Sequence, residues 1–385
     1  MNIQNLKVAL VHDYLREYGG AEMVLEDLHN IFPDAPIYTF YYDSKGLGIH
    51  QDRVKKWMIK TSIYQHFPFA KKFLSASRLI APKIFEGFDL KEFDVVISSS
   101  NHHSAKAVRV SPKALHLSYI HTPPKMLYGY TTSFNYKKHW WTRIAAECAN
   151  HLLRLIDFRI SQRPDILIAN SKNVAQRILK FYRRDSVIVY PGVDVEKYKN
   201  MQKRDGGYFL VLNRLSRGKG TEIAVAACTE LNLNLKVAGS GPETENLQKI
   251  AGKKVAFLGH VTEEEKMQLL SQATALIVAT EGEDFGITVV EAMAAGTPVI
   301  AAKSGGYLET VLAGKTGEFF EMPENLGTSK KYVDSVATAS LVEVLKNFNP
   351  QKYDEQMIRN RAEKFSKENF KKQILSLVEK NLKKQ

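Results

Sequence analysis

Two glutamates frame a glycine-containing loop in the segment EDFGITVVEAMAAGTPVIA, which begins at Glu283. A strand-like apolar run precedes this loop and a helix-like run follows it, so the N–H groups of Phe285, Gly286 and Ile287 would stand at a helix start. The helix dipole favours an anionic ligand there. Glu283 and Glu291 could accept hydrogen bonds from sugar and ribose hydroxyls, although either residue alone would be more typical of a helix cap or a surface position.

A pair of cations occupies a second loop, in the segment LNRLSRGKG (Leu212–Gly220). Arg214 and Lys219 stand between a strand-like run and a helix-like run, where positive charge opposes the helix dipole. A bound diphosphate would explain them, because two cations neutralise it and stabilise the charge that develops as it leaves. The glycine pair in SGGYLETV (Ser304–Val311) would also let a phosphate approach the backbone closely.

The first half of the chain carries two further candidate positions. Gly19 and Gly20, in EYGGAEM, separate a strand-like run from a helix-like run, and their amides could contact a phosphate or a hydroxyl. A packing turn would need the same glycines. His121, in SYIHTPPKMLYGY, follows a strand-like run and could bind sugar hydroxyls or assist an acceptor. An isolated histidine is more often structural, so both interpretations of His121 stay open.

Residues that usually bind metals do not occur at ligand spacing. No DxD-like pair stands out, and His102–His103 lacks suitably spaced carboxylates. The two cysteines, Cys148 and Cys228, exclude a disulfide framework and a cysteine–zinc cluster, and they fit a reducing cytoplasm. We therefore expect that the protein needs neither a metal ion nor a cofactor.

These loops require a framework of alternating strands and helices. Apolar runs without a polar face are typical of parallel sheets covered on both sides, and amphipathic segments separate them. We expect two doubly wound, Rossmann-like α/β domains whose ligand loops follow the carboxyl ends of the strands. The predicted strands are Leu6–His12, Asp94–Ser100, Ala114–Ile120, Asp165–Ser171, Ser186–Tyr190, Tyr208–Arg214, Leu233–Gly239, Lys254–Gly259, Ala275–Thr280 and Thr297–Ala302.

The seam between the domains is expected within Pro191–Gly207, where proline, glycine and a polar stretch follow a strand. The predicted domains are residues 1–195 and 196–362, with a basic helix at 363–385 that packs back toward the N-terminal domain. The residues expected to dock this helix are Phe365, Phe370, Ile374 and Leu377.

Positive charge is concentrated in the N-terminal half. Of the net charge of +13, residues 1–195 carry 27 Lys plus Arg against 17 Asp plus Glu. Arg53–Lys83 has eight basic residues, no acidic one, and interleaved apolar groups. This mixture favours an anionic membrane surface; nucleic acid and a merely solvated helix face are the alternatives, and no nucleic-acid module is recognisable. The interleaved apolar residues are Trp57, Ile59, Tyr64, Phe67, Phe69, Phe73 and Leu74.

The N-terminus lacks a basic leader with a long apolar run, and no stretch of about 18 apolar residues occurs. These features predict a cytoplasmic protein. Together with the basic segment, they predict peripheral attachment at the inner face of a membrane.

The chain resembles the family 4 glycosyltransferases, retaining enzymes of the GT-B fold, in which two such domains face each other across a cleft. The resemblance covers nearly the whole chain, and the order and spacing of its segments make it specific. The matching segments are GGAE (Gly19–Glu22), IHTPP (Ile120–Pro124), IANSKNVAQRI (Ile168–Ile178), YPGVD (Tyr190–Asp194), NRLSRGKG (Asn213–Gly220), FLGHVTEEE (Phe257–Glu265), EDFGITVVEAMAAGTPVI (Glu283–Ile300) and SGGYLETV (Ser304–Val311).

This resemblance implies transfer of a sugar from a nucleotide donor with retention of anomeric configuration and without a metal. In similar enzymes, the residues matching Arg214 and Lys219 hold the diphosphate. Those matching His121 and Glu283 contact the transferred sugar, and we expect these two to be catalytic. The expected donor-binding residues are Gly19, Gly20, Arg214, Lys219, Glu263, Lys266, Phe285, Gly286, Ile287 and Glu291.

Donor and acceptor identity follow less directly. Glu263 could accept from guanine N1–H and N2–H while Lys266 reaches O6, which favours GDP-mannose over UDP-glucose or another UDP-sugar; acids at a helix start are also ordinary dipole chemistry. The histidine loop continues as KMLYGY (Lys125–Tyr130) where an Arg–Tyr–x–Trp–Asp pattern is usual, and Asn213 replaces a common glycine. Both departures leave the acceptor less defined than the donor.

We therefore expect a hexosyltransferase of polysaccharide biosynthesis that acts on a membrane- or lipid-linked glycan. A nucleotide-sugar 2-epimerase shares this architecture but would not be expected to keep Arg214, Lys219 and Glu283 together. A nicotinamide-dependent oxidoreductase would need GxGxxG after the first strand, and GGAE does not supply it. A lectin-like or scaffolding protein would tolerate the loss of donor residues that are all present here.

Overall fold

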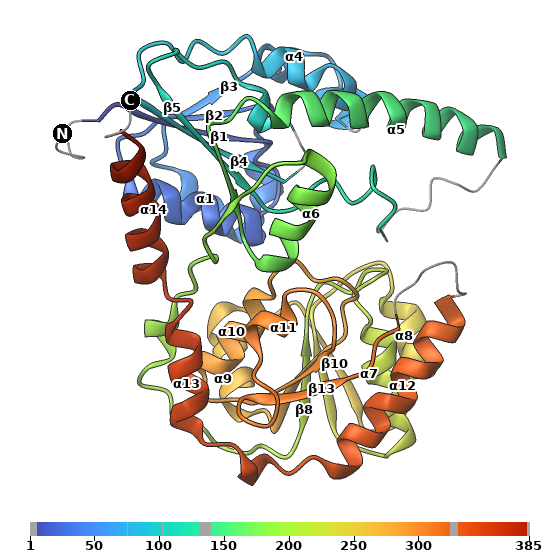
Figure 1. The fold of residues 1–385 in the computed structure, drawn as a ribbon. Coiled ribbons are helices and arrows are strands. Elements are labelled where there is room, and N and C mark those ends of the chain that lie inside the picture. The colour runs from blue at the N-terminus through green and yellow to red at the C-terminus, as the bar shows by residue number, and fades with distance from the viewer. Residues whose placement is uncertain (1–5, 75, 102–103, 131–139, 324–329, 383–385) are drawn as a thin grey trace. The chain divides into compact units, whose positions relative to one another are not determined.

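The computed structural model describes residues 6–74, 76–101, 104–130, 140–323 and 330–382. These residues divide into two compact units (Figure 1). The first contains the chain up to Gly192 together with the C-terminal residues from Glu368 onward, and the second contains Val193–Lys367. Each unit is built on one parallel sheet.

The sheet of the first unit has the strand order β3-β2-β1-β4-β5-β6-β7. Its order reverses between β1 and β4, which pair in parallel with His12 beside Ser99. Alternate side chains of β1 enter two different core clusters, so the strand is buried on both faces and has no polar side. The strands are β1 (Val8–His12), β2 (Ile37–Thr39), β3 (Ile59–Thr61), β4 (Val95–Ser100), β5 (Leu115–Ile120), β6 (Ile166–Ala169) and β7 (Val187–Ile188).

Helices cover both faces of this sheet. Val24 and Leu28 of α1 pack into the cluster on one face, while Phe85 of α4 and Ile160 of α5 pack into the cluster on the other. The α-helices are α1 (Gly20–Ile31), α2 (Gln51–Val54), α3 (Ala70–Phe73), α4 (Ala81–Phe85), α5 (Trp140–Ser161) and α6 (Lys172–Tyr182). The 3-10 helices are η2 (Ser44–His50), η3 (Ile63–His66), η4 (Ala76–Leu79) and η5 (Ala105–Ala107).

The C-terminal helix α14 (Lys367–Leu382) completes the core of the first unit. Phe370, Ile374 and Val378 recur every four residues, so they share one face, and all three are buried in the same cluster as α1. The predicted packing of this helix toward the N-terminal domain is confirmed. Of the other predicted docking residues, Leu377 is partly buried against this cluster and Phe365 lies in the second unit, while Val378 was not predicted.

The second unit repeats the same topology, with the strand order β10-β9-β8-β11-β12-β13 and a reversal between β8 and β11. Helix α7 packs against α12, and α10 packs against both α9 and α13. The strands are β8 (Phe209–Leu212), β9 (Leu235–Ala238), β10 (Val255–Gly259), β11 (Ala275–Val278), β12 (Val299–Ala302) and β13 (Gly317–Phe320). The helices are η6 (Val195–Tyr198), α7 (Thr221–Glu230), α8 (Thr244–Ile250), α9 (Glu263–Gln272), α10 (Ile287–Ala294), α11 (Tyr307–Thr310), α12 (Lys330–Asn347), η7 (Pro350–Lys352) and α13 (Glu355–Glu363).

The predicted α/β fold with two doubly wound parallel sheets is confirmed, and every predicted strand run contains a strand. Three of the described strands were not predicted. β2 and β3 have three residues each, too few to show a period, and β3 lies inside the basic segment. β13 reads GEFF and has a glutamate at its second position, which hides its apolar character.

Candidate functional site

A lysine and a glutamate meet where the second sheet reverses its strand order. The loops that follow β8 and β11 carry Lys219 and Glu283, and Lys219 Nζ lies 3.2 Å from Glu283 Oε2. This carboxylate raises the pKa of Lys219. The two side chains are 36% and 21% exposed, so a ligand can reach both. Open parallel sheets bind ligands beside such a reversal, at the carboxyl ends of the strands.

Glycines bring the loops of this site together. Gly220 has φ 67°, and a Cβ there would lie 2.1 Å from the Ala279 carbonyl oxygen at the end of β11. Gly305 has φ 59°, and a Cβ there would lie 2.3 Å from the Glu283 carbonyl oxygen. The next glycine, Gly306, donates its N–H to that same oxygen at 2.7 Å. The SGGY glycines therefore fix the backbone of Glu283.

The helix that follows Glu283 starts at a bare glycine cap. Gly286 has φ 91° and directly precedes Ile287, the first residue of α10. Phe285 turns its ring away into the core, where it packs edge to face against Phe365 at 5.4 Å between centroids. The Tyr307 ring packs beside Gly286, 2.9 Å from where a Cβ would lie. No side-chain cap bonds to the start of α10, so the positive end of its dipole favours an anionic ligand.

A second lysine joins two more of the expected residues. Lys266 Nζ lies 2.7 Å from Glu291 Oε1 and 3.0 Å from Glu263 Oε1. Burial raises the pKa of Glu291, and Lys266 opposes that shift. Burial also works to lower the pKa of Lys266, but the two carboxylates hold it above its usual value. The side chain of Glu263 is 39% exposed and that of Glu291 only 9%, so Glu263 is the carboxylate more open to a ligand.

Arg214 and Asn213 begin the loop that carries Lys219. Ser216 donates its N–H to the Arg214 carbonyl oxygen at 2.8 Å, which makes a tight turn directly after β8. The side-chain oxygen of Asn213 accepts a hydrogen bond from the Thr221 hydroxyl at 3.1 Å. The asparagine that replaces a common glycine thus ties the strand end to the first residue of α7.

A chain of polar side chains marks the corresponding reversal in the first sheet. His12 ends β1 beside Ser99 of β4, and His121 directly follows β5. The Ser99 hydroxyl lies 3.1 Å from His12 Nδ1 and 2.8 Å from His121 Nε2. One hydroxyl therefore links the predicted His121 to a second buried histidine that the sequence analysis did not single out.

Glu22 connects this chain to the glycine pair. His12 Nε2 lies 3.4 Å from Glu22 Oε1, and Gly19 donates its N–H to Glu22 Oε2 at 2.9 Å. Burial works to raise the pKa of Glu22, but the hydrogen bonds from His12 and Gly19 lower it below its usual value. The structure thus joins His121 to Gly19 and Gly20 through His12 and Glu22. The only sequence indication that Glu22 belongs to this site was its place in the GGAE segment.

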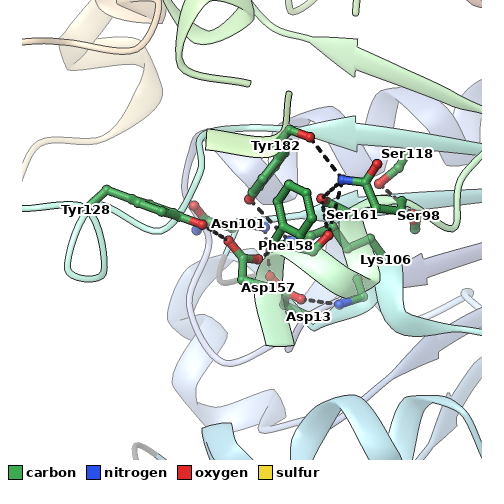
Figure 2. Close-up of polar contacts among 12 residues, drawn as sticks. Asp13, Ser98, Asn101, Lys106, Ser118, Tyr128, Asp157, Phe158, Ser161 and Tyr182 are labelled. Carbon is green, nitrogen blue, oxygen red and sulfur yellow. Dashed lines mark hydrogen bonds and ion pairs between the residues drawn. The ribbon is translucent and has the colours of Figure 1, made fainter. Parts of the chain in front are cut away.

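A buried ion pair between distant parts of the first unit also escaped the sequence analysis (Figure 2). Lys106 Nζ lies 2.6 Å from Asp157 Oδ1, and the two side chains are 1% and 0% exposed. Tyr128 donates its hydroxyl to the other Asp157 oxygen at 2.8 Å, and Tyr182 lies 3.4 Å from the lysine. The pair ties η5, α5 and α6 together. No local sequence pattern predicts this ion pair, because its residues lie far apart along the chain.

The basic segment presents only part of the surface predicted for it. Tyr64 and Leu74 are buried in a core cluster of the first unit, so the prediction that these two meet a membrane is wrong. Trp57 and Ile59 are partly buried against the other cluster. Large apolar side chains remain exposed around them, with Phe69 at 76%. The exposed members are Met58, Ile63, Phe67, Phe69, Phe73, Leu79 and Ile80.

Several of the cations in this segment are already paired. Lys71 forms an ion pair with Asp43 at 2.7 Å, and Arg53 pairs with Glu26 at 3.2 Å. Lys55, Lys56 and Lys72 are exposed. Across the described part of the chain, no helix has the length and apolar character needed to cross a membrane.

Metal ligands do not gather in the part of the chain that the structure describes, where no three His, Cys, Asp or Glu residues are arranged around a common point. His102 and His103 lie outside the described residues.

Comparison with known proteins gives a consistent assignment of the second unit. Residues 193–359 match the family described as Glycosyl transferases group 1. Alpha-1,3/1,6-mannosyltransferase ALG2 of Dictyostelium discoideum is 24% identical over 378 residues, which cover 82% of this chain and 86% of that protein. A GDP-mannose-dependent alpha-(1-6)-phosphatidylinositol monomannoside mannosyltransferase of Mycolicibacterium smegmatis is 29% identical over 211 residues, or 47% of this chain and 53% of that protein.

Solved structures share the fold of the whole chain. Anabaena Alr3699/HepE in complex with UDP and glucose aligns with a TM-score of 0.68 at 19% identity, over 97% of this chain and 100% of that one. Sucrose-phosphate synthase from Thermosynechococcus elongatus also aligns with a TM-score of 0.68, at 17% identity, over 99% of this chain and 100% of that one. At these identities the likeness concerns the fold.

Proposed function

We propose that the chain, which has the GT-B fold, is a group 1 glycosyltransferase and that it transfers a hexose from a nucleotide sugar to a lipid-linked glycan. Mannose from GDP-mannose is the leading donor. Its support is the similarity to ALG2 and to a GDP-mannose-dependent transferase. A UDP-sugar is the second candidate, because the structurally similar Anabaena protein was solved with UDP and glucose.

The observation that carries the proposal is the Lys219–Glu283 pair at the reversal of the second sheet. A bound diphosphate attracts Lys219, together with Arg214, more strongly than a single carboxylate does. Glu283 is then free to accept a hydrogen bond from a hydroxyl of the donor sugar. The α10 amides at Gly286 and Ile287 stabilise negative charge at the same place without a metal ion.

The proposed chemistry retains the configuration at the anomeric carbon. The bond between this carbon and the donor phosphate breaks, and the acceptor hydroxyl attacks from the side that the phosphate leaves. The departing phosphate takes the proton of the acceptor hydroxyl. His121, held by Ser99, donates or accepts a hydrogen bond at a hydroxyl of the transferred sugar.

In the proposed nucleotide site, Glu291 holds the ribose and Glu263 meets the base. Glu263 suits this role because it is the more exposed of the two carboxylates on Lys266. A carboxylate pairs with the adjacent N1–H and N2–H donors of guanine. Uracil and adenine do not present two such donors to one carboxylate.

Calorimetric titration of the whole chain with GDP, UDP and ADP tests the donor class. GDP is expected to bind at least about tenfold more tightly than UDP, and Glu263→Gln should reduce that preference, since a carboxylate's hydrogen bonds contribute about 1.5–3 kcal/mol. Glu264→Gln is the matched control on the exposed side of α9. Tighter binding of UDP would overturn the guanine preference, and no binding of any nucleotide would overturn the proposed function.

Turnover is tested with radiolabelled GDP-mannose, UDP-glucose and other nucleotide sugars. Slow release of labelled sugar in the absence of acceptor should occur with the true donor and should persist after chelation of divalent metals. Loss of this activity on chelation would contradict the metal-independent mechanism. If the chain instead converted the donor into its 2-epimer, the proposed transferase function would be wrong and an epimerase function would take its place.

Attachment to an anionic membrane is the proposed route to a lipid-linked acceptor. Its support is the group of exposed apolar side chains around Phe69 with the exposed cations Lys55, Lys56 and Lys72. Flotation with phosphatidylcholine vesicles should show binding only when phosphatidylglycerol is included, and less binding at high salt. Replacing the three lysines together by glutamine should abolish it, whereas equal binding by this variant would contradict the attachment.

A further inference from the structure

A pocket lies in the first unit, beyond the end of β1. Asp13 and Tyr14, directly after this strand, form one side of it, and residues of η4 and α4 form another. Its polar lining is Asp13, Tyr14, Arg16, Ser77, Arg78 and Ser104, and its apolar lining is Phe40, Leu74, Ala81 and Phe85. The roles proposed above use none of these residues.

Two half-buried arginines supply the positive charge of this pocket. Among the described residues, no carboxylate lies within ion-pair distance of Arg16 or Arg78. Arg78 donates to the Met126 sulfur, and the Arg16 guanidinium lies 5.0 Å from the centroid of the Tyr14 ring. Burial lowers the pKa of Arg78, so its charge is poorly solvated. Asp13, which also lines the pocket, acts on Arg78 as a nearby negative charge. One carboxylate does not balance two half-buried arginines, and a bound anion would offset the remaining cost of removing a cation from water.

The one carboxylate of the pocket is engaged by the backbone. Asp13 accepts from the Asn101 N–H at 2.7 Å and from the Ala105 N–H at 2.6 Å, one at each oxygen. These contacts hold its charge toward β4 and η5. With two arginines against one aspartate, the pocket keeps a net positive charge. Burial raises the pKa of Tyr14, so its hydroxyl stays protonated.

Exposed apolar side chains occur in the same stretch of chain as the apolar lining of the pocket. Leu74 and Ala81 line the pocket, while Phe73, Leu79 and Ile80, within two residues of them in the chain, are exposed. A ligand that follows both surfaces must carry an anionic group attached to a hydrocarbon. A wholly polar anion would leave this apolar wall in contact with water.

We propose that Arg16 and Arg78 bind the phosphate of the acceptor, a phosphate or diphosphate ester of a hydrocarbon alcohol. This rests on the transferase function proposed above and defines the acceptor class for it. The pocket and His121 lie at the same edge of the sheet, because β1, β4 and β5 are adjacent. Two strand spacings separate Asp13 from His121, about 10 Å. The acceptor's phosphate can therefore be held while its glycan end reaches the histidine.

Three soluble probes test the pocket in the whole chain by calorimetry: geranyl diphosphate, geraniol and inorganic pyrophosphate. Geranyl diphosphate should bind most tightly, since it alone has both the phosphates and the hydrocarbon. Arg16→Ala and Arg78→Ala should each weaken it at least about tenfold, the loss typical of one charge-assisted contact. Arg78→Lys should weaken it less. Lys91→Ala, an exposed charge change elsewhere in the first unit, should leave binding unchanged.

The outcomes separate this inference from the proposed function. GDP or UDP binding is measured in the same variants and should stay within twofold of the unmodified chain. If nucleotide binds but geranyl diphosphate does not, or binds regardless of Arg16 and Arg78, the pocket assignment is overturned and the transferase proposal stands. If pyrophosphate bound as tightly as geranyl diphosphate, the proposal that the ligand carries a hydrocarbon group would be wrong. If Arg78→Ala fails to fold by circular dichroism, Arg16→Ala and Arg78→Lys carry the test.

Discussion

Apart from the additional edge strand β7 of the first unit, the two sheets have the same strand order and reverse it at the same point. The side chains at that point differ. In the second unit each key glutamate is paired with a lysine, as in Lys219–Glu283 and Lys266–Glu291. In the first unit a serine hydroxyl links two histidines, and one of these contacts Glu22. Exchangeable ion pairs suit an anionic ligand that competes for the lysines. A chain joined through a hydroxyl suits the positioning of sugar and acceptor hydroxyls.

The largest effect is expected from removing a cation in the second unit. Lys219→Ala should lower kcat/KM for sugar transfer about 10²–10³-fold, the usual cost of losing one group that stabilises a developing anion. Initial rates with labelled donor measure this loss. Lys253→Ala, an exposed lysine of the same unit, should keep full activity. A loss below about threefold in Lys219→Ala would remove the basis of the comparison.

A stability effect should distinguish the first unit. His116 is buried beside Ser98, and burial lowers its pKa to about 3. Because the unfolded chain binds this proton more readily, stability is retained above about pH 6.5 and is lost as pH falls below it. The loss at pH 4 should be roughly 3 kcal/mol.

Urea unfolding followed between pH 7 and pH 4 measures that loss. His116→Gln lacks the titrating group and should lose less stability over this range than the unmodified chain. The exposed His66, changed to glutamine, is the control and should behave as the unmodified chain does. Identical acid sensitivity in all three proteins would contradict the assignment to His116.

A smaller effect is expected from neutralising one glutamate of the second unit. Glu291→Gln keeps the shape of the side chain but removes its charge beside Lys266. Nucleotide affinity should fall about 10-fold, because a hydrogen bond to a charged group contributes about 1.5–3 kcal/mol. Calorimetry with the preferred nucleotide measures this change, and unchanged affinity would mean that Glu291 has only a structural role.

The smallest effect is expected in the first unit. Ser99→Ala removes the hydroxyl between His12 and His121 and should lower kcat/KM about three- to tenfold, matching one neutral hydrogen bond. Nucleotide affinity should stay the same, which a folding defect would not preserve. Ser100→Ala, the adjacent buried serine of β4, is the control. A loss as large as that of Lys219→Ala would show that the two units do not differ in the way described.

Sequence reasoning worked best where a site is local in the chain. Glu283, Gly286 and Glu291 lie within nine residues, and the lysine loop has its own glycine-rich pattern. The structure adds what spacing cannot show, namely that Lys219 contacts Glu283 and that Lys266 turns toward Glu291. Contacts between distant residues are set by strand order.

The first unit shows the limit of that reasoning. His121 was found from its loop, but His12 and Ser99 reach it only because β1, β4 and β5 are adjacent. The pairing of Lys106 with Asp157 has the same origin. The prediction for the basic segment Arg53–Lys83 was partly wrong for another reason. Composition does not tell which of its aromatic residues turn into the core.

The position of α14 has a consequence for how the protein is made. Phe370, Ile374 and Val378 fill the core of the N-terminal sheet, yet they follow the whole second unit in the chain and are synthesised after it. That sheet therefore emerges from the ribosome with part of its apolar face bare, and it stays so while the whole second unit is translated. A nonsense mutation just before α14 would leave the first unit open to chaperone capture and degradation, although every proposed donor-binding residue had been made.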